Sequence, residues 1–131
     1  MRLLLDTHIW LWSQLEPQRI SPAVARELSE PGNELWLSPV SVWEALLLAG
    51  KGRVWLDDEP LAWVRRALDA APVREAPLTF EVVYAMARID LPHRDPADRF
   101  LAATAYAYGL TLVTADRNLS SLKNIEVLVN R

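Results

Sequence analysis

The sequence predicts an α/β domain of three layers, with a central parallel sheet between helices. Short apolar runs rich in β-branched residues alternate along the chain with longer helical patterns. Two of these runs, residues 2–5 and 110–114, are followed by an aspartate, Asp6 and Asp116. Because ligands of open α/β sheets bind beyond the carboxyl ends of the strands, these two acids indicate a site at that edge.

The composition of the chain is that of one globular domain, which we expect to span residues 1–131. About half of the residues (51%) are hydrophobic and 24% are charged, which is enough to form a sizeable core. The absence of cysteine excludes disulfides and thiolate zinc sites, and it agrees with a cytoplasmic protein. No apolar run reaches the roughly 20 residues of a membrane span. The net charge of −3 does not indicate a nucleic-acid binder, although acids gathered at a metal site would conceal a basic remainder.

The first half of the chain alternates between strand and helix patterns. The expected elements are a strand at 2–5, a short helix at 7–12, a helix at 22–29 capped by Ser21, a strand at 35–38 and a helix at 39–50. Glu44 is the only charged residue in the last helix, which is otherwise apolar nearly all round. We therefore expect this helix to be largely buried. Glu44 should then lie at a polar edge, pair with an arginine or bind metal.

The second half continues the alternation. The expected elements are a helix at 59–71 with Leu61, Val64 and Leu68 on one face, a minimal strand within 72–77, a helix at 79–89, a helix at 96–108, a strand at 110–114, a short turn or helix at 118–122 and a strand at 125–129. Asp95 is a good N-cap for the helix at 96–108, Pro96 suits its first position, and Gly109 is its natural stop. Asp98 falls in the first turn of this helix, near the positive end of its dipole.

Four acids share one structural context. Each lies at the carboxyl end of a strand or in the helix that follows: Asp6, Glu44, Asp98 and Asp116. Their mutual repulsion should raise their pKa values unless a cation is bound. Oxygen ligands without cysteine suit Mg²⁺ or Mn²⁺, which can activate water for attack on a phosphodiester.

A metal-free alternative would use only two carboxylates, as glycosidases do, in a sugar-binding cleft. The six tryptophans would suit such a cleft. However, four of them lie within helical patterns and are expected in the core or at a dimer interface: Trp10, Trp12, Trp43 and Trp63.

Four sequence segments resemble the PIN-domain family, and more narrowly the VapC toxins of bacterial type II toxin–antitoxin systems. The segments are LLLDTH at 3–8, SVWE at 41–44, DPADRFLAATA at 95–105 and LVTAD at 112–116. The resemblance covers essentially the whole chain. It implies a Mg²⁺- or Mn²⁺-dependent endoribonuclease with a parallel sheet of strand order 3-2-1-4-5. It also implies a homodimer and an antitoxin whose tail blocks the acidic pocket.

The resemblance assigns roles to individual residues. The family's acidic quartet, which would act in catalysis and metal binding, matches Asp6, Glu44, Asp98 and Asp116. Supporting roles beside the quartet are expected for Thr7, Asp95, Arg99 and Thr114. Among these, Thr114 matches a hydroxyl often found beside the last acid, and Asp95 is expected to cap a helix first and to bind metal second. His8 and His93 are placed outside the direct ligands.

Two other functions remain open at this point. A PIN nuclease of RNA processing or of DNA ends, without an antitoxin, would use the same pocket. A non-enzymatic interaction domain would need the four acids only as helix caps. A receiver-like phosphorelay domain is excluded, because its acid pair after the first strand and its late lysine are both missing.

Overall fold

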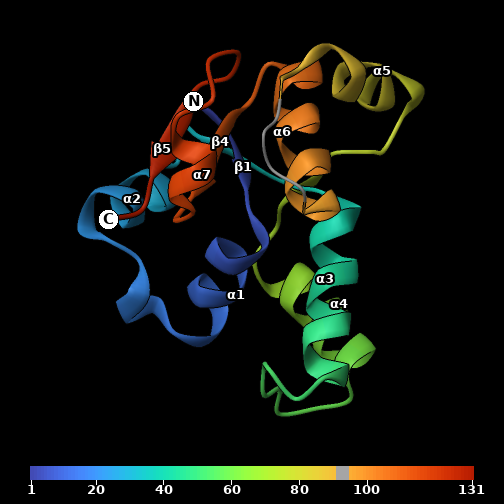
Figure 1. The fold of residues 1–131 in the computed structure, drawn as a ribbon. Coiled ribbons are helices and arrows are strands. Elements are labelled where there is room, and N and C mark those ends of the chain that lie inside the picture. Colours follow the sequence, from blue (N-terminus) through green and yellow to red (C-terminus); the bar gives the residue numbers. More distant parts are fainter. Residues whose placement is uncertain (91–94) are drawn as a thin grey trace.

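The computed structural model describes residues 1–90 and 95–131. These residues form one parallel sheet with helices on both faces, and the strand order is β3-β2-β1-β4-β5 (Figure 1). The strands are β1 Arg2–Leu5, β2 Glu34–Leu37, β3 Arg74–Glu75, β4 Thr111–Thr114 and β5 Val127–Val129. The predicted α/β class and strand order are confirmed. His93 lies outside the described residues.

Helices connect the strands at or near the predicted positions, although the first helix is longer than predicted and the short helix that follows it was not predicted. They are α1 Thr7–Leu15, η1 Pro17–Arg19, α2 Pro22–Ser29, α3 Pro39–Gly50, α4 Pro60–Ala70, α5 Phe80–Arg88, α6 Pro96–Tyr108 and α7 Arg117–Ser120. None of the helices in the described part of the chain has the length and apolar content needed to cross a bilayer.

Strand β1 is the middle of the sheet and is buried on both of its faces. Leu3 and Leu5 belong to one core cluster, to which the helices α1, α2, α3 and α4 also contribute. Leu4 points to the opposite face, into a cluster with Leu101 of α6 and Leu112 of β4. Because side chains alternate along a strand and both faces are covered, the strand reads as a continuous apolar run.

Helix α6 begins and ends as its sequence predicts. The Asp95 side chain accepts a hydrogen bond from the Ala97 N–H at 2.9 Å, and Pro96 occupies the first turn. Gly109 adopts φ 65°, the left-handed conformation that ends a helix with little cost only in glycine. The small side chains of α6 let it pack closely on two sides, since Ala105 is buried against the sheet and Ala103 is buried against α5.

Helix α3 has the predicted bounds but not the predicted burial. Trp43 and Leu47 are 54% and 39% exposed, so the expectation of a largely buried helix is wrong. An apolar sequence does not show how many neighbours a helix will have, and these two side chains of α3 remain exposed to solvent. Ser38, expected at the end of a strand, instead caps α3 by accepting a hydrogen bond from the Val40 N–H at 3.0 Å.

Helix α4 presents a slightly different face to the core from the one predicted. Leu61 is 45% exposed, whereas Trp63, Val64 and Ala67 are buried. Trp63 packs against Trp10 of α1 edge to face, with ring centroids 5.8 Å apart. Both tryptophans therefore lie in the core as expected, which Trp43 does not.

Candidate active site

One small pocket lies at the carboxyl edge of the sheet and gathers acids from distant parts of the chain. Its volume is about 290 Å³, and its walls are formed by Asp6, Thr7, His8, Glu44, Asp95, Asp98 and Asp116. All four acids of the predicted quartet line this pocket, together with Asp95. They come from the end of β1, from α3, from the start of α6 and from the end of β4.

The pairing of β1 with β4 brings the first and last of these acids together. Leu5 pairs with Val113, and the Asp6 N–H donates to the Val113 carbonyl at 3.0 Å. The fully buried Thr114 hydroxyl donates to Asp6 Oδ2 at 2.5 Å. The Asp116 N–H donates in turn to Thr114 Oγ1 at 3.0 Å. Thr114 therefore links the two acids, because its hydroxyl donates to the Asp6 carboxylate and accepts from the Asp116 backbone N–H.

A second buried hydroxyl orients Glu44. Thr7, only 2% exposed, donates its hydroxyl to Glu44 Oε1 and lies 3.0 Å from the hydroxyl of Ser41. Sequence reasoning overlooked Ser41. A signal was available, because Ser41 precedes Glu44 by one helical turn and therefore shares its face of α3.

Three of the acids also cap helices. Asp6 Oδ1 accepts from the Ile9 N–H at 3.0 Å, and Asp116 Oδ1 accepts from the Asn118 N–H at 2.9 Å. Asp95 caps α6 in the same way. The interpretation of the acids as caps is thus correct for part of the set. It does not account for Glu44, which lies within α3 rather than at its start.

Burial raises the pKa of two carboxyls in the pocket. For Asp6, burial is the main cause, and the hydrogen bonds from Thr114 and Ile9 oppose it. For Glu44, burial again comes first, the bond from Thr7 opposes it, and the negative charges of Asp95 and Asp6 raise the pKa further. The sequence led us to expect repulsion as the main cause, and this is wrong, because desolvation acts more strongly than the neighbouring charges.

The pocket suits a hard cation by its chemistry. All its acidic groups offer oxygen, the donor that Mg²⁺ and Mn²⁺ prefer. Among residues 1–90 and 95–131, no three His, Cys, Asp or Glu side chains stand close enough to form a ready-made ion site. Mg²⁺ does not require one, since it keeps several waters and is usually bound through one or two carboxylates.

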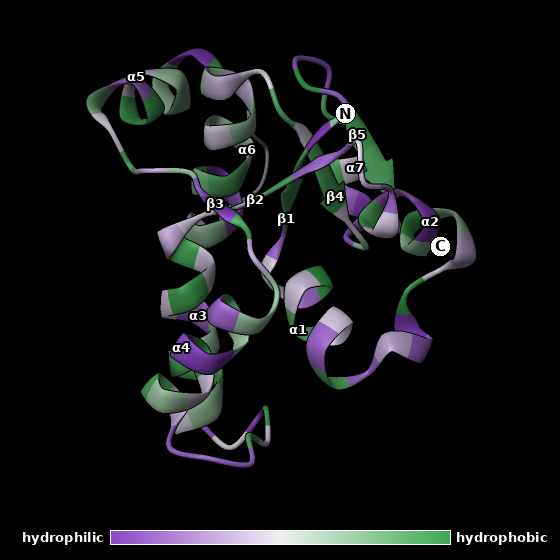
Figure 2. Ribbon diagram, turned by 180° about the vertical axis from the view of Figure 1, so that it is seen from behind, coloured by the Kyte–Doolittle hydropathy of each residue, from purple (hydrophilic) through white to green (hydrophobic). Residues whose placement is uncertain are grey.

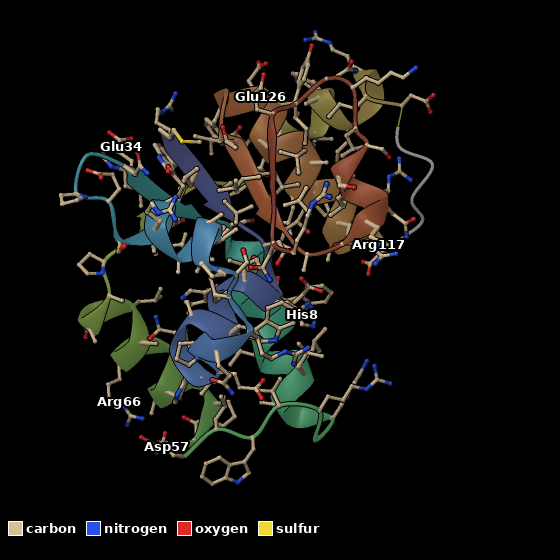
Figure 3. The ribbon with its side chains drawn as sticks, turned by 90° about the vertical axis from the view of Figure 1, so that its left-hand side faces the viewer. His8, Glu34, Asp57, Arg66, Arg117 and Glu126 are labelled. Atoms are coloured by element: carbon tan, nitrogen blue, oxygen red, sulfur yellow. The ribbon has the colours of Figure 1, made fainter. Side chains whose placement is uncertain are left out.

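His8 and Arg99, which the sequence analysis also considered, differ in their relation to the pocket. His8 lines the pocket, and its position in the middle of this side of the molecule can be followed in Figure 3. Its ring lies 5.8 Å from that of Trp12. Arg99, expected to support the acids, does not line the pocket, and its Nε is buried without a hydrogen-bond partner among the described residues.

A larger groove of about 1000 Å³ adjoins the acidic pocket. The two hollows share His8, Glu44 and Asp95. The other groove walls are mainly apolar side chains of α1 and α3, with basic side chains at η1 and the loop after α3: Leu11, Trp12, Leu15, Leu47, Leu48, Arg19, Lys51, Arg53, Val54 and Trp55, with Glu16. The groove therefore has an apolar body and an acidic end.

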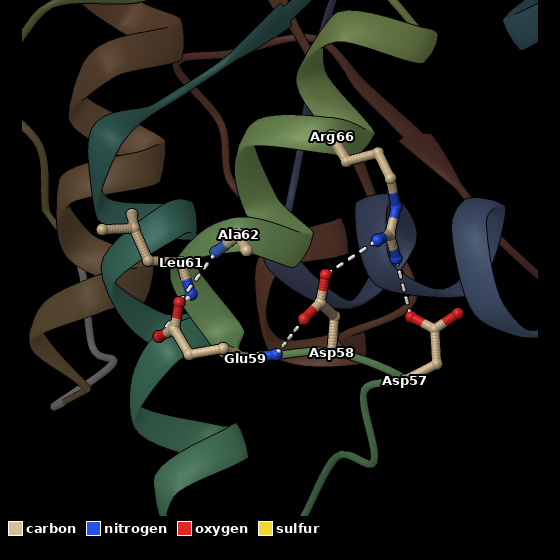
Figure 4. Close-up of polar contacts among 6 residues, drawn as sticks. All are labelled: Asp57, Asp58, Glu59, Leu61, Ala62 and Arg66. Atoms are coloured by element: carbon tan, nitrogen blue, oxygen red, sulfur yellow. Dashed lines mark hydrogen bonds and ion pairs between the residues drawn. The ribbon is translucent and has the colours of Figure 1, made fainter.

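The loop that forms one wall of the groove is held at its far end. Arg66 of α4 bridges Asp57 and Asp58, with N···O distances of 2.7 and 2.9 Å (Figure 4). Glu59 then caps α4 by accepting from the N–H groups of Leu61 and Ala62. The ion pairs are about half exposed, so we expect them to orient the loop more than to stabilise the fold.

The fold and its acidic pocket define a PIN-domain protein. The PIN domain family model matches residues 3–125, and the chain belongs to this family. It is similar to Ribonuclease VapC22 of Mycobacterium tuberculosis, with 38% identity over 122 residues that cover 91% of this chain and 90% of the relative.

Solved structures show the same fold. The structure of VapBC2 from Rickettsia felis, bound to a DNA fragment from its promoter, aligns with a TM-score of 0.74 over the whole of both chains at 14% identity. VapBC-5 from Mycobacterium tuberculosis, a member of the VapBC family of toxin–antitoxin systems, aligns with a TM-score of 0.59 at 20% identity, covering 99% of this chain and 98% of the other.

The raised pKa of Glu44 predicts how stability depends on pH. A carboxyl with a raised folded-state pKa favours the native state while protonated, and this contribution is lost as pH rises through that pKa. In EDTA, the wild type should therefore lose stability relative to Glu44→Gln as pH rises above about 4.3, the ordinary pKa of glutamate. Urea unfolding between pH 4 and 8 measures the difference. Glu126→Gln, at an exposed position outside the pocket, is the control. Parallel curves for the wild type and Glu44→Gln would contradict the prediction.

Proposed function

We propose that this protein is a Mg²⁺- or Mn²⁺-dependent endoribonuclease that acts as the toxin of a toxin–antitoxin pair. One observation carries the proposal: five carboxylates line a single pocket at the carboxyl edge of a PIN-domain sheet. The similarity to a ribonuclease of the VapC class supports RNA as the substrate. A PIN nuclease without an antitoxin remains the alternative, and a DNA-binding protein encoded next to this chain would argue against it.

The catalytic and metal-binding roles are proposed for Asp6, Glu44, Asp98 and Asp116. When bound, a divalent ion would lower the pKa of a water and neutralise charge on the phosphodiester. The hydroxyl of Thr114 keeps Asp6 oriented, and that of Thr7 keeps Glu44 oriented. Because these donors are themselves buried, the carboxylates hold their positions without depending on solvent.

The proposed partner is an antitoxin whose tail occupies the groove beside the pocket. The apolar wall formed by Leu11, Trp12 and Leu15 suits the apolar side chains of a peptide. The acidic end suits an arginine or lysine, which would form charge-assisted hydrogen bonds with the carboxylates. We further propose a homodimer, as the family resemblance implies.

The catalytic proposal predicts the effect of Asp116→Asn. The substitution keeps the shape and the capping oxygen but removes the charge, so RNA cleavage should fall by several orders of magnitude while the fold persists. Cleavage of labelled RNA in Mn²⁺ and in EDTA measures the effect. Asp69→Asn, on the exposed side of α4, should cleave like the wild type. Near-normal cleavage by Asp116→Asn would overturn the assignment.

The metal proposal predicts a change in stability that does not depend on activity. Mn²⁺ should stabilise the wild type by about 1.4 kcal/mol at ten times its dissociation constant. It should do little for Asp98→Asn, which has one charge fewer in the pocket. Thermal unfolding of both proteins with Mn²⁺ and with EDTA measures the difference. A wild type that is indifferent to Mn²⁺ would favour the interpretation of the acids as caps.

The partner proposal predicts which contact inhibits the enzyme. Replacing the partner's pocket-directed Arg or Lys by Gln should weaken inhibition of RNA cleavage more than it weakens binding. The apolar part of the groove would still hold the peptide. Leu15→Ala in this chain should do the opposite and lower affinity first. Titrated inhibition and calorimetry on the same samples separate the two effects. Unchanged inhibition by the Gln variant would show that the partner blocks the site by bulk instead.

A further inference from the structure

The groove beside the acidic pocket also has a basic end. Lys51 follows Glu44 by seven residues, which is about two turns or 10 Å along α3. Lys51 and Arg53 line the groove there, and neither forms an ion pair with another described residue. Figure 2 shows the loop that carries them as largely hydrophilic, at the end of α3 that points away from the sheet. Two cations of the groove are therefore available to an anion.

Trp55 belongs to the same loop and is held away from the core. Its neighbours Val54 and Leu56 both pack against the core cluster around β1, so the indole between them turns outward. Trp55 is 81% exposed and lines the groove. An indole with this exposure contributes little to the core, and it offers a flat surface to another planar group.

Contacts on both sides of Trp55 fix the loop. Gly52 adopts φ 71°, a conformation that glycine takes at little cost, and the Arg53 N–H then donates back to a carbonyl of α3 at 2.9 Å. On the far side of Trp55, Arg66 binds the two aspartates that follow (Figure 4). These two acids are thus paired with α4 and do not neutralise the basic end of the groove.

The wall formed by α1 and η1 adds a third cation beside a second ring. The guanidinium carbon of Arg19 lies 4.1 Å from the centroid of the Trp12 ring, and Arg19 Nη1 lies 3.4 Å from Glu16. Asn130 donates its side-chain amide to the Arg19 carbonyl at 3.0 Å. The Arg19 side chain is held by these contacts, yet it is still 52% exposed. Guanidinium planes in such positions stack on nucleic-acid bases as aromatic rings do.

From this arrangement we propose that the basic end of the groove binds single-stranded RNA next to the bond that is cut. A base stacks on Trp55, Lys51 and Arg53 bind phosphates, and Arg19 contacts a neighbouring base. We refer to Arg19, Lys51, Arg53 and Trp55 as the strand site. The inference rests on the proposed nuclease activity and adds how the substrate is held.

Charge favours a nucleic acid over a basic peptide at the strand site. The acidic end of the groove suits a basic side chain, whereas the three cations of the strand site repel one. RNA brings phosphates to these cations, and it needs a metal ion only at the acidic end, where the scissile bond would lie. Aromatic rings combined with cations are typical of sites that bind single strands.

The exposed tryptophan favours a single strand over a duplex. Bases paired in a duplex are stacked on one another, whereas unpaired bases can stack on an aromatic side chain. The roughly 10 Å between Glu44 and Lys51 corresponds to only a few nucleotides. The strand site would therefore hold nucleotides that flank the scissile phosphodiester, and it would act on binding rather than on the chemical step.

Fluorescence anisotropy in EDTA tests the inference, because RNA is then bound without being cut. The probe is a fluorescein-labelled RNA of about 20 nucleotides and random sequence, which suits stacking because every base has a π face. The wild type should bind this strand at least tenfold more tightly than an RNA duplex of the same length. Trp55→Ala should weaken strand binding at least fivefold, the lower end of what one stacked base contributes, and Trp55→Phe should retain most of the affinity.

The salt dependence of binding separates the cations from the ring. Lys51→Gln and Arg53→Gln should each reduce the slope of log affinity against log salt concentration by about 0.7, the value for one phosphate contact on a single strand. Arg53→Lys should keep the wild-type slope. Trp55→Ala should weaken binding with the slope unchanged, because stacking on an uncharged ring releases no counterion. A merely structural role of these residues would not divide the effects in this way.

Matched control variants lie outside the groove. Arg26→Gln removes an exposed cation of α2, and Phe80→Ala removes a ring of α5 that is 79% exposed. Both should bind RNA like the wild type. Circular dichroism melts confirm that each variant is folded.

Other results would overturn the inference. One is a wild type that does not bind the single strand or that prefers the duplex. Another is wild-type affinity in both Trp55→Ala and Arg53→Gln. Loss of antitoxin binding in these variants, with RNA binding unchanged, would assign the basic end to the partner instead. Cleavage in Mn²⁺ on the same samples tests the nuclease proposal separately, because a wild type that binds the strand through these residues but cuts no RNA would reject the nuclease and support the strand site.

Discussion

The candidate site depends on one constraint, the parallel pairing of β1 with β4. These strands are far apart in the sequence, yet Leu4 pairs with Leu112 and Leu5 with Val113. The pairing places the residues that follow each strand at one edge of the sheet, where Thr114 hydrogen bonds to Asp6. A shift of β4 by one residue would turn Thr114 away from Asp6, because side chains alternate between the faces of a strand. The register between β1 and β4 therefore determines both the packing of the sheet core and the positions of the acids in the pocket.

The acids at this edge of the sheet stabilise the fold as helix caps, but the burial of their charges destabilises it. As caps, Asp6, Asp95 and Asp116 satisfy N–H groups that would otherwise be unpaired at the starts of α1, α6 and α7. Burial opposes the ionised form of Asp6 and Glu44, and the hydroxyls of Thr114 and Thr7 offset part of this effect. Such a pocket is destabilising when its acids are charged and unpartnered. This gives a cation, or the basic side chain of a partner, a physical reason to bind there.

Several apolar side chains of the domain are exposed, and they gather in two places, the groove lined by α1 and α3 and the outer side of α5. The groove lined by α1 and α3 adjoins the acidic pocket and shares three residues with it. A molecule bound in the groove would therefore lie next to the carboxylates. The exposed Phe80, Val83 and Tyr84 lie on α5, which does not line the pocket but packs on α6, whose first turn carries Asp98. The groove therefore adjoins the carboxylates, whereas the exposed side chains of α5 lie away from them.

The sequence by itself determined the order and type of the elements and the acids of the candidate site, because the signals are local: caps, stops, apolar runs and the acids that follow them. Gly109 and Asp95 are examples, since each specifies a helix end through its own backbone or side chain. Only the tertiary structure decided which apolar faces are covered, as Trp43 and Leu61 show. It also revealed Ser41 beside Thr7 and excluded Arg99 from the pocket walls. Burial and side-chain contacts depend on neighbours distant in the chain, and no local pattern encodes them.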